Sequence, residues 1–164
     1  MSNKKIVMIK KPIDFPGESN FKLISEDSID LNKGEVRLQT LWLSLDPYMR
    51  GAMNRIGEGE TMVGELIGKV TESKSEIIPE GTIVLSKAGW QTSPVVNEND
   101  IKIVDSRIDP LSLALGAIGM PGLTAYFGLT KIGNPKTGET VVVSAGSGAV
   151  GSVVGQISKK LGCK

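Results

Sequence analysis

Residues 139–164 read ETVVVSAGSGAVGSVVGQISKKLGCK, and this stretch decides the fold of the last part of the chain. The run of three valines within Thr140–Ser144 predicts a strand that is buried on both faces. Gly146, Gly148 and Gly151 follow with the spacing G-x-G-x-x-G. A helix is predicted from about Gly148 to Leu161, because apolar residues recur there with helical period. Its apolar positions are Val150, Val153, Val154, Ile157 and Leu161.

A strand, a glycine-rich turn and an amphipathic helix in this order are typical of a dinucleotide-binding turn. Gly146 would allow the tight turn, Gly148 a close approach of the backbone to a pyrophosphate, and Gly151 close packing of helix on strand. The free N–H groups at the helix start, on Ala149, Val150 and Gly151, would receive a phosphate. The alternative is that the glycines merely make a turn. The residue that reads the ribose lies roughly 20 positions further on, beyond Lys164, so that half of the motif cannot be checked.

Composition places the chain among ordinary globular proteins. It has 164 residues, of which 40% are hydrophobic and 23% charged, with a net charge of +1. This charge argues against a nucleic-acid partner. No stretch approaches the roughly 20 apolar residues of a membrane span, and the apolar run near the start is too short for a signal peptide. We therefore expect a cytoplasmic protein with no membrane contact.

The chain contains no histidine and a single cysteine, Cys163. A zinc site of the usual Cys/His kind, a Ser-His or Cys-His catalytic pair and an internal disulfide are therefore excluded within this sequence. We expect no bound metal. Chemistry would depend on a bound cofactor, or on Tyr, Lys, Asp, Glu and backbone groups.

The pattern of the chain changes near residues 110–125. Up to about residue 105, short apolar segments such as Glu35–Leu43 alternate with Pro- and Gly-containing turns, which predicts a small barrel or sandwich. The segment Met53–Thr61 is expected to be a mobile loop. Beyond Asp109 the pattern favours helices, including one over Leu123–Ile132. A mainly β part followed by a β-α part indicates two architectures.

Three segments together carry a family resemblance: WLSLDPYMRG at 42–51, GMPGLTAYFG at 119–128 and VVVSAGSGAVGS at 141–152. They are similar to the medium-chain dehydrogenase/reductase superfamily. They resemble most closely its zinc-free branch of NADP-dependent alkenal and prostaglandin (leukotriene B4 12-hydroxydehydrogenase-type) reductases. The resemblance covers the whole chain but only about the first half of a family member.

The resemblance implies a mainly β fold: a GroES-like small barrel over residues 1–122, then the first β-α unit of a Rossmann domain over 123–164, which is incomplete here. The chain would be the N-terminal fragment of a longer enzyme, a homodimer at full length. That enzyme would be a zinc-independent, NADPH-dependent reductase of α,β-unsaturated ketones and aldehydes. Hydride from NADPH would reach the β-carbon of a small enal or enone substrate, and a proton would be added at the α-carbon.

The resemblance also places residues at the site. Tyr48 would lie at the domain cleft, where its phenol could donate to a carbonyl oxygen on which charge develops. Met120 and Thr124 would lie near the nicotinamide ring. Without the resemblance, Tyr48 and Met120 are most simply core residues and Thr124 an ordinary early-helix threonine. Trp42 and Trp90 are predicted to be core residues.

Two alternatives remain open from the sequence. One is a quinone oxidoreductase of the same superfamily, against which the motif Asp46-Pro47-Tyr48-Met49-Arg50 favours the reductase branch. The other is a non-enzymatic barrel domain that assembles through its terminal strand, since an exposed edge over Val141–Val143 would invite pairing with another chain.

Overall fold

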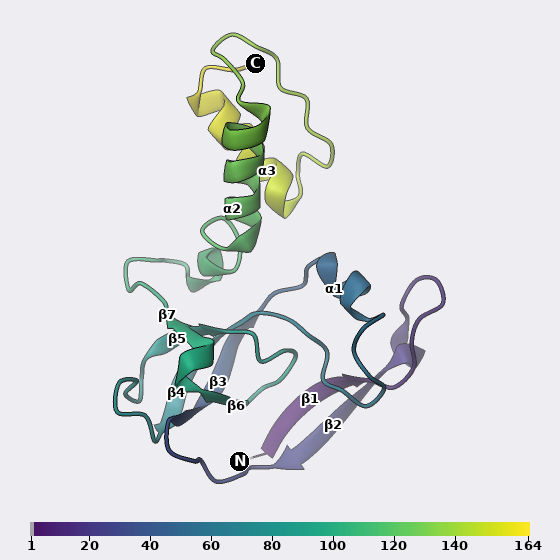
Figure 1. Ribbon diagram of the computed structural model, residues 1–164, viewed down its shortest axis with the longest axis vertical. Coiled ribbons are helices and arrows are strands. Elements are labelled where there is room, and N and C mark those ends of the chain that lie inside the picture. Colours follow the sequence, from purple (N-terminus) through teal and green to yellow (C-terminus); the bar gives the residue numbers. More distant parts are fainter. Residues whose placement is uncertain (1) are drawn as a thin grey trace. The chain divides into compact units, whose positions relative to one another are not determined.

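The computed structural model describes residues 2–164 (Figure 1). They fall into two compact units that meet in the sequence at Ser106 and Arg107, and we describe each unit by itself. The strands are β1 (Ser2–Met8), β2 (Phe21–Asp27), β3 (Glu35–Leu43), β4 (Leu66–Ser73), β5 (Ile83–Ser86), β6 (Val95–Asn97) and β7 (Ile101–Ile103). The α-helices are α1 (Tyr48–Ala52), α2 (Met120–Phe127) and α3 (Ala149–Lys160). The predicted domain boundary after Gly122 stays a prediction.

The first unit is built on a curled antiparallel sheet with the strand order β6-β3-β4-β5-β7. Its two edge strands, β6 and β7, follow each other in the chain and are joined by a single 3-10 turn, Glu98–Asp100. Because this link is short, the sheet curls and brings its two edges together. A separate hairpin of β1 and β2 joins this unit through isolated bridges from Lys5 to Gln91 and from Val7 to Thr61. The prediction of a mainly β, barrel-like fold is confirmed.

Two apolar clusters stabilise the first unit. The larger fills the inside of the curled sheet and consists of Val36, Leu38, Leu66, Val70, Ile78 and Val84. The second consists of four buried methionines, Met8, Met49, Met53 and Met62, with Trp90 and Phe21 packed against them. The methionines fill irregular space between the hairpin and helix α1, a role that suits an unbranched, flexible side chain.

Strand β3 was predicted with the correct bounds, but one of its side chains was assigned wrongly. The register against β4 shifts between Thr40 and Trp42. Such a bulge reorients the residues beyond it. Trp42 is therefore half exposed rather than part of the core, whereas Trp90 packs against the methionine cluster as expected.

The second unit contains α2 and α3. Helix α2 begins at Met120, three residues before the predicted start, because Gly119 caps it and Pro121 occupies its first turn, where proline is favoured. It continues into a π-helical turn, Gly128–Gly133, and Asn134 ends the helical run in a left-handed conformation. Helix α3 confirms the prediction closely, with Gly148 as its N-cap.

The predicted strand at Thr140–Ser144 is wrong for the part of the chain described. These residues form no ladder with another strand, and the side chain of Val142 is 90% exposed. A run of valines favours extended backbone, but a strand also requires a neighbour to accept and donate its hydrogen bonds. Among residues 2–164 no strand occupies that position.

Candidate functional site

The turn before α3 leaves backbone donors free at the start of the helix. Gly148 caps the helix without any side-chain bond, and its own N–H donates to Ala145 O at 2.8 Å. The Ser152 N–H donates to Gly148 O at 2.9 Å, which is the first helical bond. No acceptor among residues 2–164 engages the N–H groups of Ala149, Val150 or Gly151. Three free donors at the positive end of a twelve-residue helix suit an anion.

Glycines shape this turn by the space they leave. A Cβ atom on Gly151 would collide with Ala145 O and lie 2.9 Å from Gly146 Cα, so Gly151 lets the helix start pack closely on the turn rather than on the strand that was predicted. A Cβ on Gly148 would meet only Ala145 O, at 3.1 Å. The left-handed residue of the turn is Ala145, with a φ of 50°, rather than Gly146. The tight turn expected at Gly146 is therefore made one residue earlier.

The first turn of α2 holds the other two predicted residues of this unit together. The Thr124 hydroxyl donates to Met120 O at 2.8 Å and lies 3.7 Å from Met120 Sδ. A Cβ on Gly122 would collide with Ala117 O, so only glycine allows the chain to fold back under the helix start. Met120 and Thr124 are both exposed side chains on α2, which packs on α3 within the same unit.

Tyr48 lies in the first unit, as the first residue of α1. Its ring is 46% exposed, and no residue among 2–164 hydrogen-bonds its hydroxyl. Partial burial, followed by the negative charges of Glu65 and Asp46, raises the pKa of Tyr48 above its ordinary value of 10.0. The raised pKa means that the phenol keeps its proton, and can donate, up to a higher pH than an ordinary tyrosine.

Helix α1 is seated by contacts that the sequence only partly revealed. Met49 and Met53, four residues apart, both point into the methionine cluster. The Asp46 N–H donates to Met49 Sδ at 3.5 Å, and Arg50 Nη2 donates to Asp14 O at 2.8 Å. The i, i+4 spacing of the two methionines is the local signal for this helix, but a helix of five residues is too short for that spacing to predict it.

Glu65 lies close enough to act on Tyr48, a proximity that the sequence did not predict. Its carbonyl accepts the Ser44 N–H at 2.9 Å, which brings the end of β3 beside the start of β4. The negative charge of its carboxylate raises the pKa of Tyr48. The hydroxyl of Ser44, whose N–H bonds to Glu65, is buried without a hydrogen-bond partner among the described residues. Nothing in the local sequence indicates this proximity, because it follows from the register of β3 with β4.

Comparison with known proteins identifies the family. Residues 4–104 match the model of the N-terminal domain of oxidoreductase. Prostaglandin reductase 1 of Rattus norvegicus is 49% identical over all of this chain and 51% of its own length. The NADPH-dependent curcumin reductase of Escherichia coli (strain K12) is 42% identical over 99% of the chain and 49% of its own length. The chain belongs to the medium-chain dehydrogenase/reductase family.

Solved structures agree with this assignment. The crystal structure of CurA from Vibrio vulnificus in complex with NADPH has a TM-score of 0.89 and 41% identity. It covers 98% of this chain, which in turn covers 50% of CurA. The chain thus spans about half the length of the curated relatives it matches. This agrees with the sequence analysis, in which the resemblance covered about the first half of a family member.

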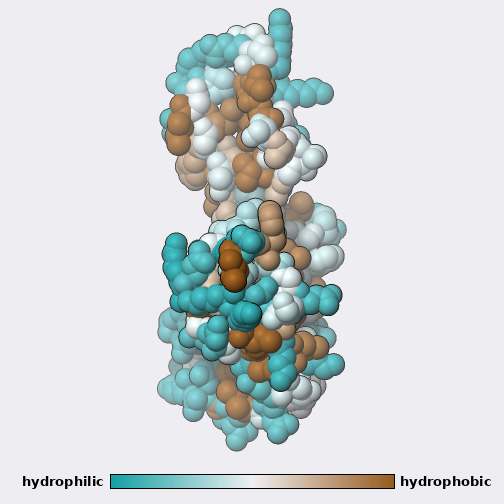
Figure 2. Space-filling model, turned by 90° about the vertical axis from the view of Figure 1, so that its right-hand side faces the viewer, coloured by the Kyte–Doolittle hydropathy of each residue, from teal (hydrophilic) through white to brown (hydrophobic). Residues whose placement is uncertain are grey.

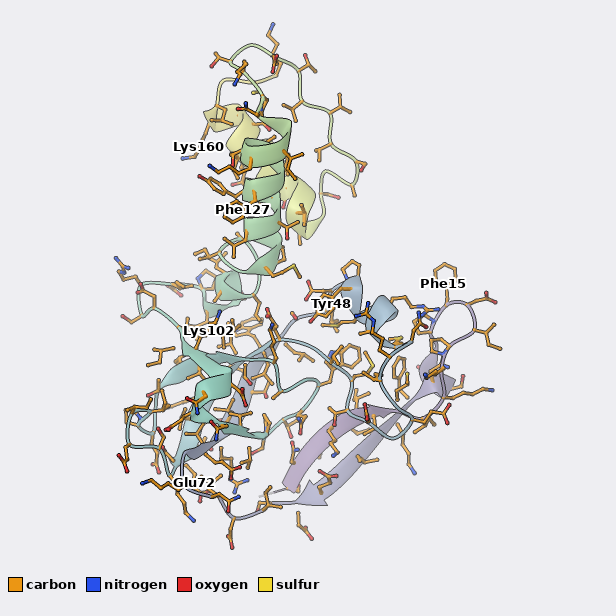
Figure 3. All side chains as sticks on the ribbon, viewed as in Figure 1. Phe15, Tyr48, Glu72, Lys102, Phe127 and Lys160 are labelled. Atoms are coloured by element: carbon orange, nitrogen blue, oxygen red, sulfur yellow. The ribbon has the colours of Figure 1, made fainter. Side chains whose placement is uncertain are left out.

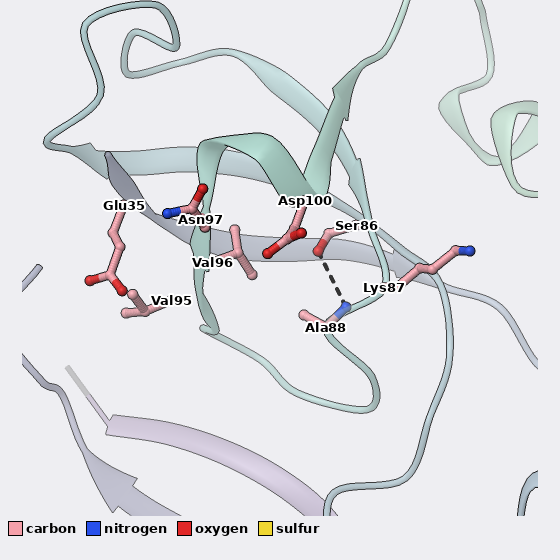
Figure 4. A pocket seen from close by; sticks show the side chains of 8 residues that line it. All are labelled: Glu35, Ser86, Lys87, Ala88, Val95, Val96, Asn97 and Asp100. Carbon is pink, nitrogen blue, oxygen red and sulfur yellow. Dashed lines mark hydrogen bonds between the residues drawn. The ribbon is translucent and has the colours of Figure 1, made fainter. Parts of the chain in front are cut away.

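The described residues were also compared with the requirements of a metal site, a membrane-spanning helix and a ligand pocket. No group of three or more His, Cys, Asp or Glu side chains in residues 2–164 could hold a metal ion. No helix in the same range is long and apolar enough to cross a membrane. An open hollow of about 510 Å³ lies beside β6, with Glu35, Lys87 and Asp100 as its charged residues, and it contains none of the predicted site residues (Figure 4).

Proposed function

We propose that the whole protein is an NADPH-dependent reductase of α,β-unsaturated ketones and aldehydes. The names of the relatives support this substrate class: prostaglandin reductase 1, curcumin reductase and 2-alkenal reductase, at 49%, 42% and 37% identity. The observation that carries the proposal is the glycine turn, whose free N–H groups lie at the start of α3. We also propose, on the family resemblance, that the whole protein is a homodimer in the cytoplasm.

The residues present fit a dinucleotide. The N–H groups of Ala149, Val150 and Gly151 would bind the pyrophosphate, and the absence of side chains at Gly146 and Gly148 leaves room for it. Met120 and Thr124 would contact the nicotinamide from the start of α2. Bound NADPH supplies the hydride that the β-carbon of the substrate receives.

Tyr48 would act on the other end of the conjugated system. Its hydroxyl is unengaged and its pKa is raised, so it can donate to the carbonyl oxygen as negative charge develops there. The support for this role is the family resemblance of the motif that contains Tyr48, together with the unengaged hydroxyl. Arg50 has a structural contact instead, since its Nη2 donates to Asp14 O at 2.8 Å.

The quinone oxidoreductase alternative has weaker support. The quinone reductase structures that resemble this chain, such as that from Bacillus thuringiensis, are 19% identical with a TM-score of 0.73, which is a likeness of fold alone. The non-enzymatic alternative has no relative among the proteins described above.

The test is NADPH consumption by the full-length protein with a panel of enals, enones and quinones. We expect oxidation of NADPH with enals and enones, and a saturated product with the carbonyl retained. Turnover of quinones alone would support the alternative oxidoreductase, and no turnover with any acceptor would support a non-enzymatic domain.

A further inference from the structure

The loop between β1 and β2 exposes two large apolar side chains. Ile13 is 89% and Phe15 is 95% exposed, on a loop that runs from Lys10 to Asn20. Figure 2 views the side on which this loop lies and shows apolar patches among hydrophilic groups. Water contact with a whole phenyl ring is unfavourable, so such a side chain is expected to gain free energy by burial against something else.

The base of this loop is closed tightly. Asn20 is buried, and its Nδ2 donates to Lys10 O at 3.0 Å while its Oδ1 accepts the Gly17 N–H at 2.8 Å. Pro12 is buried as well, and Pro16 restricts the backbone beside Phe15. A compact loop that is closed by its own side chains is the kind that frequently has a function.

The tip of the loop is bound to the helix that carries Tyr48. Arg50 Nη2 donates to Asp14 O, between the two apolar residues, at 2.8 Å. Lys11 Nζ donates to Asn54 O, just beyond the end of α1, at 3.2 Å. Figure 3 shows Tyr48 on α1 and Phe15 on the loop beside it, along one edge of the first unit. The loop is therefore fixed relative to Tyr48 at two points while its apolar side chains stay free.

We propose that Ile13 and Phe15 form an apolar wall of the substrate site that binds the hydrocarbon chain of long enals and enones. This inference rests on the proposed function, because Tyr48 must hold the carbonyl end of the substrate. A small ligand suits the wall better than a protein does. One phenyl ring and one isoleucine bury a few hundred Å² at most, whereas a stable protein interface takes about 800 Å² from each partner.

The test uses the full-length protein with trans-2-decenal as the long substrate and crotonaldehyde as the short one. The measured quantity is the ratio of kcat/KM for the long substrate to kcat/KM for the short one. We expect Phe15→Ala to lower this ratio about tenfold, and Ile13→Ala by a smaller factor, mainly through KM for the long substrate. The matched control is Ile29→Ala, which removes an apolar side chain that is 64% exposed in the link between β2 and β3.

The outcomes separate the inference from the function on which it rests. An unchanged ratio in Phe15→Ala, with wild-type turnover of both aldehydes, overturns the wall and leaves the reductase intact. A change in sedimentation of Phe15→Ala would assign the ring to contact between copies of the protein and also overturns the wall. No turnover of either aldehyde by the wild type removes the proposed function and the wall together. Thermal unfolding at the wild-type temperature would show that the variants fold, since neither side chain is buried.

Discussion

Tyr48 and Glu65 form a pair whose chemistry depends on charge rather than on a direct bond. No hydrogen bond joins them, yet the carboxylate contributes to the raised pKa of the phenol, after burial and ahead of Asp46. A donor is useful to an enolate oxygen only while it keeps its proton. Glu65 would thus extend the pH range over which Tyr48 can donate, at the cost of a less acidic donor.

Replacing Tyr48 by Phe in the full-length protein should lower kcat for enones more than it weakens NADPH binding. The hydrogen bond to the substrate oxygen strengthens as charge develops, and loss of one such donor costs roughly 2.7–4 kcal/mol at a dry site. Because the ring is 46% exposed, we expect a smaller loss than that range. Steady-state kinetics and NADPH titration measure the two effects, and an unchanged kcat would assign Tyr48 to packing.

Replacing Glu65 by Gln should move the alkaline limb of the kcat profile to lower pH. Activity falls as pH rises through the pKa of Tyr48, and removal of a negative charge brings that pKa back toward its ordinary value of 10.0. The return is partial, because burial is the largest cause and remains. Glu58→Gln is the control, since this exposed carboxylate is not among the groups that act on Tyr48. A limb that does not move would separate Glu65 from the phenol.

At the scale of elements, the sequence predicted those elements that are stabilised by interactions within one segment of the chain. Helix α3 was predicted within a residue at each end, because glycine spacing, apolar period and terminal lysines all act along one segment. Helix α1 was missed because five residues carry too little periodicity, and tertiary packing of Met49 and Met53 holds it. The proximity of Glu65 to Tyr48 depends on strand register, which no local pattern encodes.

The start of α3 provides a matched pair of glycines for a stability test. Gly151→Ala places a Cβ against Ala145 O and should destabilise the second unit by roughly 1–3 kcal/mol, the usual cost of overpacking. Gly155→Ala, one turn further along, meets nothing within 4 Å and should stabilise the helix by up to about 1 kcal/mol. Thermal unfolding followed by circular dichroism measures both. Equal effects of the two changes would show that the turn does not pack as described.

At the scale of the whole molecule, the pieces of a nucleotide site are present without the sheet that usually completes it. The wrong prediction at Thr140–Ser144 has this cause: the valine run indicated a buried strand, but burial and pairing both depend on other strands. The Val141 N–H bonds to Lys164 O, at 2.9 Å, and no acceptor in residues 2–164 engages those of Val142 and Val143. Sequence motifs thus predicted helix α3 and its cap at Gly148, whereas the tight turn lies one residue earlier than expected and its surroundings depend on other strands.

The 164-residue chain should therefore bind NADPH at least about a hundredfold more weakly than a chain of its relatives' length, and show no reductase activity. The turn offers three N–H donors to the pyrophosphate, but association costs several kcal/mol of translational and rotational freedom that these contacts alone do not offset. Loss of adenine and ribose contacts worth about 3 kcal/mol corresponds to the hundredfold factor. Isothermal calorimetry on both chains, with sedimentation to establish their oligomeric states, measures the difference. Micromolar binding by a monomer of the 164-residue chain would mean that the turn and α2 alone make a sufficient cofactor site, and that the exposed valines contribute nothing to it.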